Sequence, residues 1–218
     1  MTSVLKKVIK NFSSGIYDFK NRYKLPEEYH NSNELKIMHI SDTPDSIYSH
    51  IYKMMSYSRP DIIIHTGDLV DNLKLENAGD ELIPLYQKKS AEFIRNLEKL
   101  TSARIIYIPG NHDDIDIIEA NIGRSEIMPE GSIIELDGVK IGLAHYPKNL
   151  PLNADINLFG HNHQKDFEGG NKFLNGILNI NYILLPSKED FKVNYPWTVD
   201  QGRQYKSCLL YTSPSPRD

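Results

Sequence analysis

The chain has almost no cysteine: among 218 residues, only Cys208 carries a thiol. This scarcity excludes a disulfide framework and any metal site built from several thiolates. The sequence also has no run of about 18 apolar residues, the length that a membrane-spanning helix needs. The first 30 residues lack the continuous apolar core of a signal peptide. We therefore expect a cytoplasmic protein.

Positive charge is scarce over most of the sequence. The chain has 25 basic and 29 acidic side chains, a net charge of −4. Residues 1–24 hold six basic side chains and one acidic side chain, a net of +5, so the remainder carries −9. An acidic body argues against a wide basic groove for nucleic acid. It is compatible with a small substrate held by metal ions.

We divide the chain into three segments. In residues 1–34, apolar residues at near-helical spacing alternate with lysines, which predicts an N-terminal amphipathic helix over 3–20. We expect this helix to pack on the flank of the domain; contact with a membrane surface or a partner is the alternative. Residues 35–207 form one domain, long enough to bury a core. Residues 208–218 resemble a translated sequencing adapter and are excluded from fold reasoning.

From residue 35 the sequence alternates between strand and helix patterns. Ile-rich segments bounded by turn residues predict strands at 35–40, 61–65, 104–108 and 156–159, with one or two more in 177–185. Segments 133–136 and 139–145 are expected to form a hairpin around Asp137-Gly138. Helices are predicted at 46–58 and about 80–100. This alternation predicts a layered α/β fold with right-handed crossovers.

Five short polar motifs follow the predicted strands. In order they are Ser41-Asp42-Thr43-Pro44, Gly67-Asp68-Leu69-Val70-Asp71-Asn72, Gly110-Asn111-His112-Asp113, Leu143-Ala144-His145-Tyr146 and Gly160-His161-Asn162-His163. Ligands of open α/β sheets bind at the carboxyl ends of the strands. We therefore expect the polar residues of the five motifs to converge on one place.

The order and residue types of these motifs resemble the calcineurin-like metallophosphoesterase family, whose pattern is D-x-H, G-D-x-x-D, G-N-H-D/E, H and G-H-x-H. The resemblance covers about residues 35–165 and suits a compact bacterial-type member. It implies a layered β-sandwich flanked by helices. It also implies a small phosphoester substrate, in particular a phosphodiester, hydrolysed by a hydroxide that bridges two metal ions. Imidazole ligands favour Mn²⁺, Fe or Zn²⁺ over Mg²⁺.

The resemblance assigns a role to each motif residue. Asp68 corresponds to the carboxylate that bridges both ions. The other ligands correspond to Asn111, His145 and His161 for the second ion, and to Asp42 and His163 for the first.

Two further residues of the third motif correspond to groups beside the substrate. His112 matches the imidazole that stabilises the transition state or protonates the leaving group. Asp113 matches the carboxylate that orients this imidazole. Asp71 is expected to support neighbouring ligands. His39 and His65 precede the ligand positions on the opposite strand face, which favours a buried structural role.

Pro44 stands where the family pattern has a metal-binding histidine, and its ring nitrogen cannot ligate. We expect the first ion to keep Asp42, Asp68 and His163, with water in the vacant position, so that the first site is weaker rather than absent. Asp45 could replace the lost ligand, although a solvent-exposed helix cap is the preferred interpretation.

The loss of this ligand leaves two hypotheses open. The chain is either a metal-dependent phosphoesterase or a non-catalytic binding or scaffold module that keeps the fold. The retained His112-Asp113 pair favours the enzyme, since a scaffold has no need of a positioned imidazole.

Overall fold

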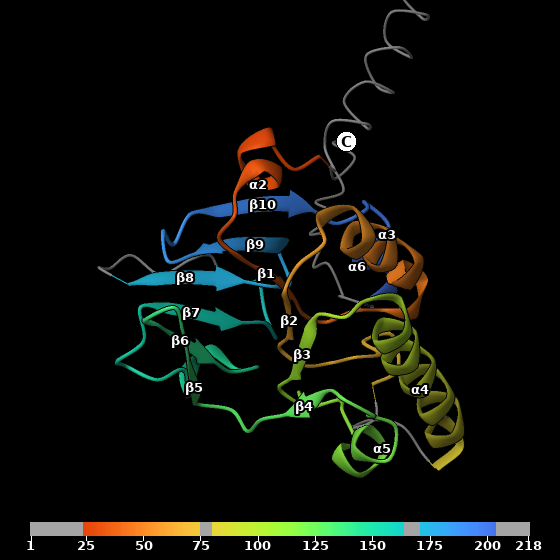
Figure 1. The fold of residues 1–218 in the computed structure, drawn as a ribbon. Helices are drawn as coiled ribbons and strands as arrows, with labels where there is room; N and C mark the ends of the chain where they lie inside the picture. The colour runs from red at the N-terminus through yellow and green to blue at the C-terminus, as the bar shows by residue number, and fades with distance from the viewer. Residues whose placement is uncertain (1–23, 75–79, 164–170, 204–218) are drawn as a thin grey trace, which may run out of the picture.

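The computed structural model describes residues 24–74, 80–163 and 171–203 (Figure 1). The predicted N-terminal helix over 3–20 and the adapter-like segment 208–218 lie outside these residues. The helices are α2 (Glu27–Asn31), α3 (Tyr48–Ser58), α4 (Ile83–Leu100), α5 (Ile115–Glu119) and α6 (Val199–Gly202), with single turns η1 (Asp45–Ile47), η3 (Asp80–Leu82) and η4 (Pro147–Asn149). No helix in the described part of the chain is both long and apolar enough to cross a bilayer.

The strands form two sheets. The larger sheet has the order β10-β9-β1-β2-β3-β4. Strands β1 to β4 run parallel to one another, and β9 pairs antiparallel with both of its neighbours, β1 and β10. The smaller sheet has the order β5-β6-β7-β8. The strand bounds are β1 Leu35–Ile40, β2 Ile62–His65, β3 Arg104–Tyr107, β4 Glu126–Ile127, β5 Ser132–Leu136, β6 Val139–Leu143, β7 Ile156–Phe159, β8 Lys172–Asn175, β9 Asn179–Leu185 and β10 Asp190–Asn194.

Strand alternation divides the interior into two apolar layers. On β1, Ile37 faces the core between the sheets, where it joins Ile141 and Leu158 of the smaller sheet. Its neighbour Met38 faces the opposite way, into a core shared with α3 and α4. Successive side chains of a strand point to opposite faces, so a strand buried on both faces reads as a continuous apolar run. The predicted β-sandwich flanked by helices is confirmed.

Helices α3 and α4 cover the outer face of the larger sheet (Figure 1). On α4, Tyr86, Phe93 and Leu97 recur at helical spacing and are fully buried. Phe93 stacks on Tyr48 of α3, with ring centroids 4.4 Å apart. The layer formed by α3 and α4 packs on the outer face of the larger sheet, and the polar motifs follow the carboxyl ends of the parallel strands.

The predicted central strands and both long helices are present, whereas β4, β8 and β10 were missed. All three lie at sheet edges. Edge strands are short and carry polar side chains that discourage pairing with other chains, so they lack the apolar pattern that reveals a central strand. Segment Asp190–Asn194 (DFKVN) has only Val193 fully buried, for example.

Candidate metal centre

The polar motifs lie at the carboxyl ends of strands from both sheets. Asp42, Asp68 and Asn111 follow β1, β2 and β3 of the larger sheet. His145 and His161 follow β6 and β7 of the smaller sheet. The centre therefore sits where the two layers of the sandwich meet along one edge, and neither sheet could assemble it alone.

The backbone at the centre is unusual. Asp42, Asp68 and His161 all have positive φ, at 51°, 58° and 70°. Residues other than glycine seldom adopt this region, and such strain gathers at functional sites. Gly67, with φ of 99°, allows the close packing, because a Cβ there would lie 2.5 Å from Nδ1 of His145. The imidazole of His145 occupies the space that a side chain at position 67 would need, so the residue before Asp68 must be a glycine.

His145 is the residue on which the centre converges. It is fully buried, and its Nδ1 lies 2.7 Å from the backbone carbonyl of Thr66. A carbonyl only accepts, so Nδ1 carries the proton and Nε2 of the neutral ring presents a lone pair. That Nε2 lies 3.0 Å from Oδ1 of Asn111 and 3.2 Å from Nδ1 of His161. The Thr66 carbonyl thereby fixes which nitrogen faces the centre.

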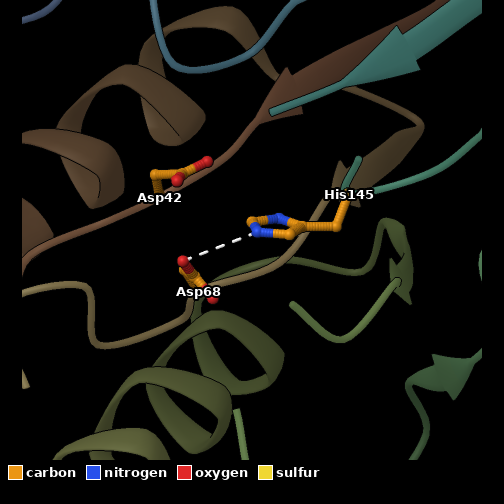
Figure 2. Close-up of side chains that lie close together, drawn as sticks. All are labelled: Asp42, Asp68 and His145. Atoms are coloured by element: carbon orange, nitrogen blue, oxygen red, sulfur yellow. Dashed lines mark ion pairs between the residues drawn. The ribbon is translucent and has the colours of Figure 1, made fainter. Parts of the chain in front are cut away.

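Two buried carboxylates complete the group. Oδ2 of Asp68 lies 3.6 Å from Nε2 of His145. Ligand atoms of Asp42, Asp68 and His145 all lie within 4.8 Å of one another (Figure 2). The other Asp68 oxygen, Oδ1, accepts a hydrogen bond of 3.0 Å from the amide of His112. One oxygen of Asp68 is thus tied to the backbone and the other faces the imidazole.

This set of atoms fits a divalent cation. Potential ligand atoms of one carboxylate, one amide and two imidazoles lie 3.0–3.6 Å apart in four contacts. Ligands at about 2.1 Å from a metal stand about 3.0 Å apart in an octahedron and about 3.4 Å apart in a tetrahedron. A proton on Nδ1 of His161 would serve its two contacts with Asn111 and His145, whereas a cation would accept electron pairs from all four groups. The fit rests on the donor chemistry of Asp68, Asn111, His145 and His161.

The raised pKa values of the buried carboxyl groups also favour a bound cation. Burial raises the pKa of Asp68 well above its ordinary value, and the charges of Asp42 and Asp113 raise it further. Burial and Asp42 raise the pKa of Asp71 to about 7. Carboxylates crowded in this manner resist ionisation unless a positive charge is present. A metal ion supplies such a charge.

Asp113 has a structural role in addition to the orientation of His112 that the sequence leads us to expect. Oδ2 accepts hydrogen bonds from the amides of Asp68 at 2.7 Å and Gly110 at 2.8 Å. Oδ1 accepts from the amide of Leu69 and the hydroxyl of Tyr86, both at 2.9 Å. These bonds join the second and third motifs. The orientation of His112 by this carboxylate stays a prediction.

The end of the centre expected to hold the first ion differs from the expectation. The group of converging ligand atoms among the described residues consists of Asp42, Asp68 and His145 and contains neither His161 nor His163, so the role of His163 as a ligand stays a prediction. Its side chain is 45% exposed, and Nε2 lies 3.9 Å from Oδ1 of Asp200. Oδ2 of Asp45 pairs with Lys89 at 3.0 Å, and the replacement of the lost ligand by Asp45 stays a prediction. Asp45 does not cap the helix, because Pro44 occupies the N-cap position of η1.

Residues of the second motif hold the altered first motif in place. The amide of Asp71 donates to the carbonyl of Thr43 at 3.2 Å. Oδ1 of Asn72 accepts from the amide of Asp45 at 2.9 Å. Asp71, which is fully buried, also pairs with Lys74. The last residues of G-D-x-x-D-N therefore support the loop that carries Asp42.

His39 and His65 have structural roles. The amide of Gly67 donates to Nδ1 of His65, so Nε2 carries the proton toward Thr43, 2.9 Å away. His39 lies 2.9 Å from the Thr66 hydroxyl. Burial lowers the pKa of each imidazole to about 3, so both rings are neutral at pH 7. Both rings stabilise, through these hydrogen bonds, the loops that carry the ligand residues.

Sequence reasoning missed two groups that shape the centre. Arg203 is 1% exposed, and its Nε donates to the carbonyl of Asp42 at 2.8 Å. Glu130 accepts from the amides of His145 and Tyr146, at 2.7 and 2.6 Å. Both lie outside the five motifs. Only the rarity of a buried arginine could have drawn attention to Arg203, and burial is not visible in the sequence.

Comparisons with known proteins identify a family and a likeness of fold. A family model described as calcineurin-like phosphoesterase matches residues 35–209. No curated protein matches the chain. One crystal structure aligns with a TM-score of 0.55 and 11% identity, over 75% of this chain and 100% of its own, a likeness of fold alone.

Two other solved structures align less closely in space. YfcE, a phosphoesterase from E. coli, has a TM-score of 0.49 and 18% identity, over 73% of this chain and 100% of its own. The protein of unknown function AQ665 from Aquifex aeolicus has a TM-score of 0.39 and 21% identity, over 65% and 89%.

Proposed function

Because the chain belongs to the calcineurin-like phosphoesterase family, we propose that it hydrolyses phosphodiesters with a divalent metal held at the centre formed around His145. The observation that carries the proposal is the convergence of potential ligand atoms from Asp68, Asn111, His145 and His161 at contacts of 3.0–3.6 Å. Mn²⁺, Fe and Zn²⁺ suit this mixture of imidazole and oxygen ligands.

Hydrolysis of a phosphodiester forms a bond from a water oxygen to phosphorus and breaks the bond to one ester oxygen. The water loses a proton and the leaving oxygen gains one. A divalent ion, when bound, lowers the pKa of water and neutralises phosphoryl oxygens. His112 is proposed to deliver the proton to the leaving oxygen, since its backbone amide is anchored on Asp68 at 3.0 Å. The unperturbed pKa of an imidazole lies near neutrality, which suits this type of transfer.

A cavity lined by His163 and by Arg203, which donates to the Asp42 carbonyl, supports a diester rather than a monoester, although none of the four proposed ligands lines it. It has a volume of about 200 Å³, and its lining includes His163, Asn194, Trp197 and Arg203. The Trp197 side chain is 70% exposed. A second substituent on phosphorus needs such a space, and an exposed indole offers it a large apolar surface. The small substrate and the cytoplasmic setting expected from the sequence stay predictions.

The direct test is turnover of bis(p-nitrophenyl) phosphate by the purified chain with and without Mn²⁺. We expect release of nitrophenol that a chelator abolishes and Mn²⁺ restores. A chain that binds Mn²⁺ but shows no turnover above the rate in buffer would instead support the binding-module hypothesis, which the proline of the first motif favours.

A further inference from the structure

The position of the lost histidine is occupied by packed protein. Pro44 is buried, and a Cβ added at Gly202 would lie 2.9 Å from both Cβ and Cγ of the Pro44 ring. It would lie equally close to Oγ of Ser46. Helix α6 therefore lies directly against the first motif, and only a glycine allows this approach. A histidine at position 44 would compete with α6 for space.

The residue after Gly202 brings a permanent positive charge to the same place. Three guanidinium nitrogens of Arg203 donate to backbone carbonyls: Nε to Asp42 at 2.8 Å, Nη1 to Ile177 at 2.7 Å and Nη2 to Ser41 at 3.3 Å. The guanidinium also lies 4.7 Å from the ring centroid of Tyr195. Its nearest carboxylate partner is Asp200, at 3.6 Å, which is itself 63% exposed. Among the described residues, the ion-pair partner of this buried cation is therefore an exposed carboxylate.

The two other residues expected to hold the first ion, Asp42 and His163, each have a partner within the protein. Oδ2 of Asp42 accepts a hydrogen bond of 2.5 Å from the Ser41 hydroxyl and one of 3.1 Å from the amide of His161. His163 lies near Asp200, the acid that also pairs with Arg203. Of the residues predicted for a first ion, Asp42 and Asp68 keep ligand atoms within 4.8 Å of that of His145, whereas His163 is not in this group.

We propose that this centre holds one divalent ion rather than two, bound by Asp68, Asn111, His145 and His161, and that Arg203 is the fixed cation that takes the place of the first ion beside Asp42. The inference deepens the proposed hydrolysis, on which it rests. A guanidinium is always protonated, is only weakly hydrated and tolerates burial, so it can provide charge where a ligand set is incomplete. It cannot activate water as a metal does, which leaves that task to the single ion.

The test measures metal content rather than activity. The purified full chain is equilibrated with Mn²⁺, freed of excess ions and analysed for Mn²⁺ per chain, together with its electron paramagnetic resonance spectrum. Two Mn²⁺ ions about 4 Å apart couple magnetically, whereas a single ion gives the six-line signal of an isolated centre. We expect one equivalent and an uncoupled spectrum. Two equivalents with a coupled spectrum overturn the inference and leave hydrolysis standing; no bound ion overturns both.

Variants assign the role of Arg203. Pro44→His alone is expected to keep one equivalent, because α6 and the guanidinium remain. Pro44→His combined with Arg203→Met should bind a second Mn²⁺ at least about tenfold more tightly than Pro44→His. Pro44→His with Arg203→Lys retains a charge and should stay at one. If the Met and Lys forms titrate alike, Arg203 does not exclude the second ion and the inference fails.

A matched control at Arg124 separates the effect of the positive charge near Asp42 from the effect of removing any arginine that bonds to backbone carbonyls. Arg124 also donates to backbone carbonyls, those of Thr101 and Ala103, but it is exposed and far from the five motifs in the fold. Arg124→Met in the Pro44→His background should leave metal content at one. A gain there equal to that of Arg203→Met would contradict the assigned role. Thermal melting of each variant establishes that it is folded, and the wild-type stoichiometry decides the first part of the inference even if Arg203→Met does not fold.

Discussion

The carboxylate of Asp113 accepts a hydrogen bond of 2.7 Å from the backbone amide of Asp68. The same oxygen, Oδ2, accepts from the amide of Gly110 at 2.8 Å. One carboxylate thereby sets the distance between the loop that carries Asp68 and the loop that carries Asn111. The ligand geometry depends on this pair, although neither bond involves a ligand atom.

Asp113→Asn preserves the shape of this side chain but turns one of its two oxygens into a donor. Each oxygen now accepts from two donors, so either orientation of the amide places NH₂ against N–H or O–H groups. We expect a loss of about 1–3 kcal/mol in the free energy of unfolding. Metal binding should weaken by about 10–100-fold. Chemical denaturation and Mn²⁺ titration measure the two effects.

The matched control is Asp116→Asn, on the exposed face of α5, which should change neither quantity. If Asp113→Asn lowers kcat while stability and metal affinity are unchanged, the carboxylate acts on His112 alone and the joining of the loops is unimportant.

His112→Ala should lower kcat by about 10²–10⁴-fold, because proton transfer by a positioned side chain contributes this much. The loss should grow with the pKa of the leaving alcohol, since a nitrophenolate departs without a proton and an alkoxide does not. Steady-state rates with aryl and alkyl phosphodiesters measure the trend. His30→Ala, an exposed histidine of α2, is the control. An equal loss for both leaving groups would assign His112 to binding instead.

Trp197→Ala should raise KM for a bulky phosphodiester by about tenfold, which corresponds to losing about 1.4 kcal/mol of apolar contact. A methyl phosphodiester should show little change, since it does not reach the indole. Trp197→Phe should retain most of the affinity. Leu152→Ala, which removes another exposed apolar side chain, serves as the control. If KM rises equally for both substrates, the indole does not contact the second substituent.

His39 should make stability depend on pH. Burial lowers the pKa of its imidazole to about 3 in the folded protein, below the unfolded value of about 6.5. The folded state therefore binds fewer protons, and stability is lost as the pH falls below about 6.5. At pH 5 the loss due to this residue is about 2 kcal/mol.

His39→Asn removes the titration, so its free energy of unfolding should fall less between pH 7 and pH 5 than that of the wild type. Denaturant unfolding at the two pH values measures this difference, with His30→Asn as the exposed control. Parallel pH profiles for the wild type and His39→Asn would show that the ring is not held neutral by burial.

The central strands and the placement of the motifs could be predicted because both follow from local pattern. Ile-rich runs such as 62–65 are buried on both faces, and the parallel strands β1 to β3 present their carboxyl ends at one edge. Asp42, Asp68 and Asn111 were placed correctly at those ends for this reason.

The rest depended on contacts between distant parts of the chain. Nothing local marks Arg203 as the partner of Asp42, from which it is separated by 161 residues. The pairing of Asp200 with His163 is of the same kind. Spacing along the sequence also could not show that a glycine at 202 lets α6 reach Pro44.

The carbonyls of Ser41 and Asp42 accept hydrogen bonds from Arg203, a residue that is synthesised much later. During synthesis, β1 and its loop emerge from the ribosome long before residue 203, and until then the guanidinium is missing from beneath them. The order of translation therefore delays completion of the centre until residue 203 has been made.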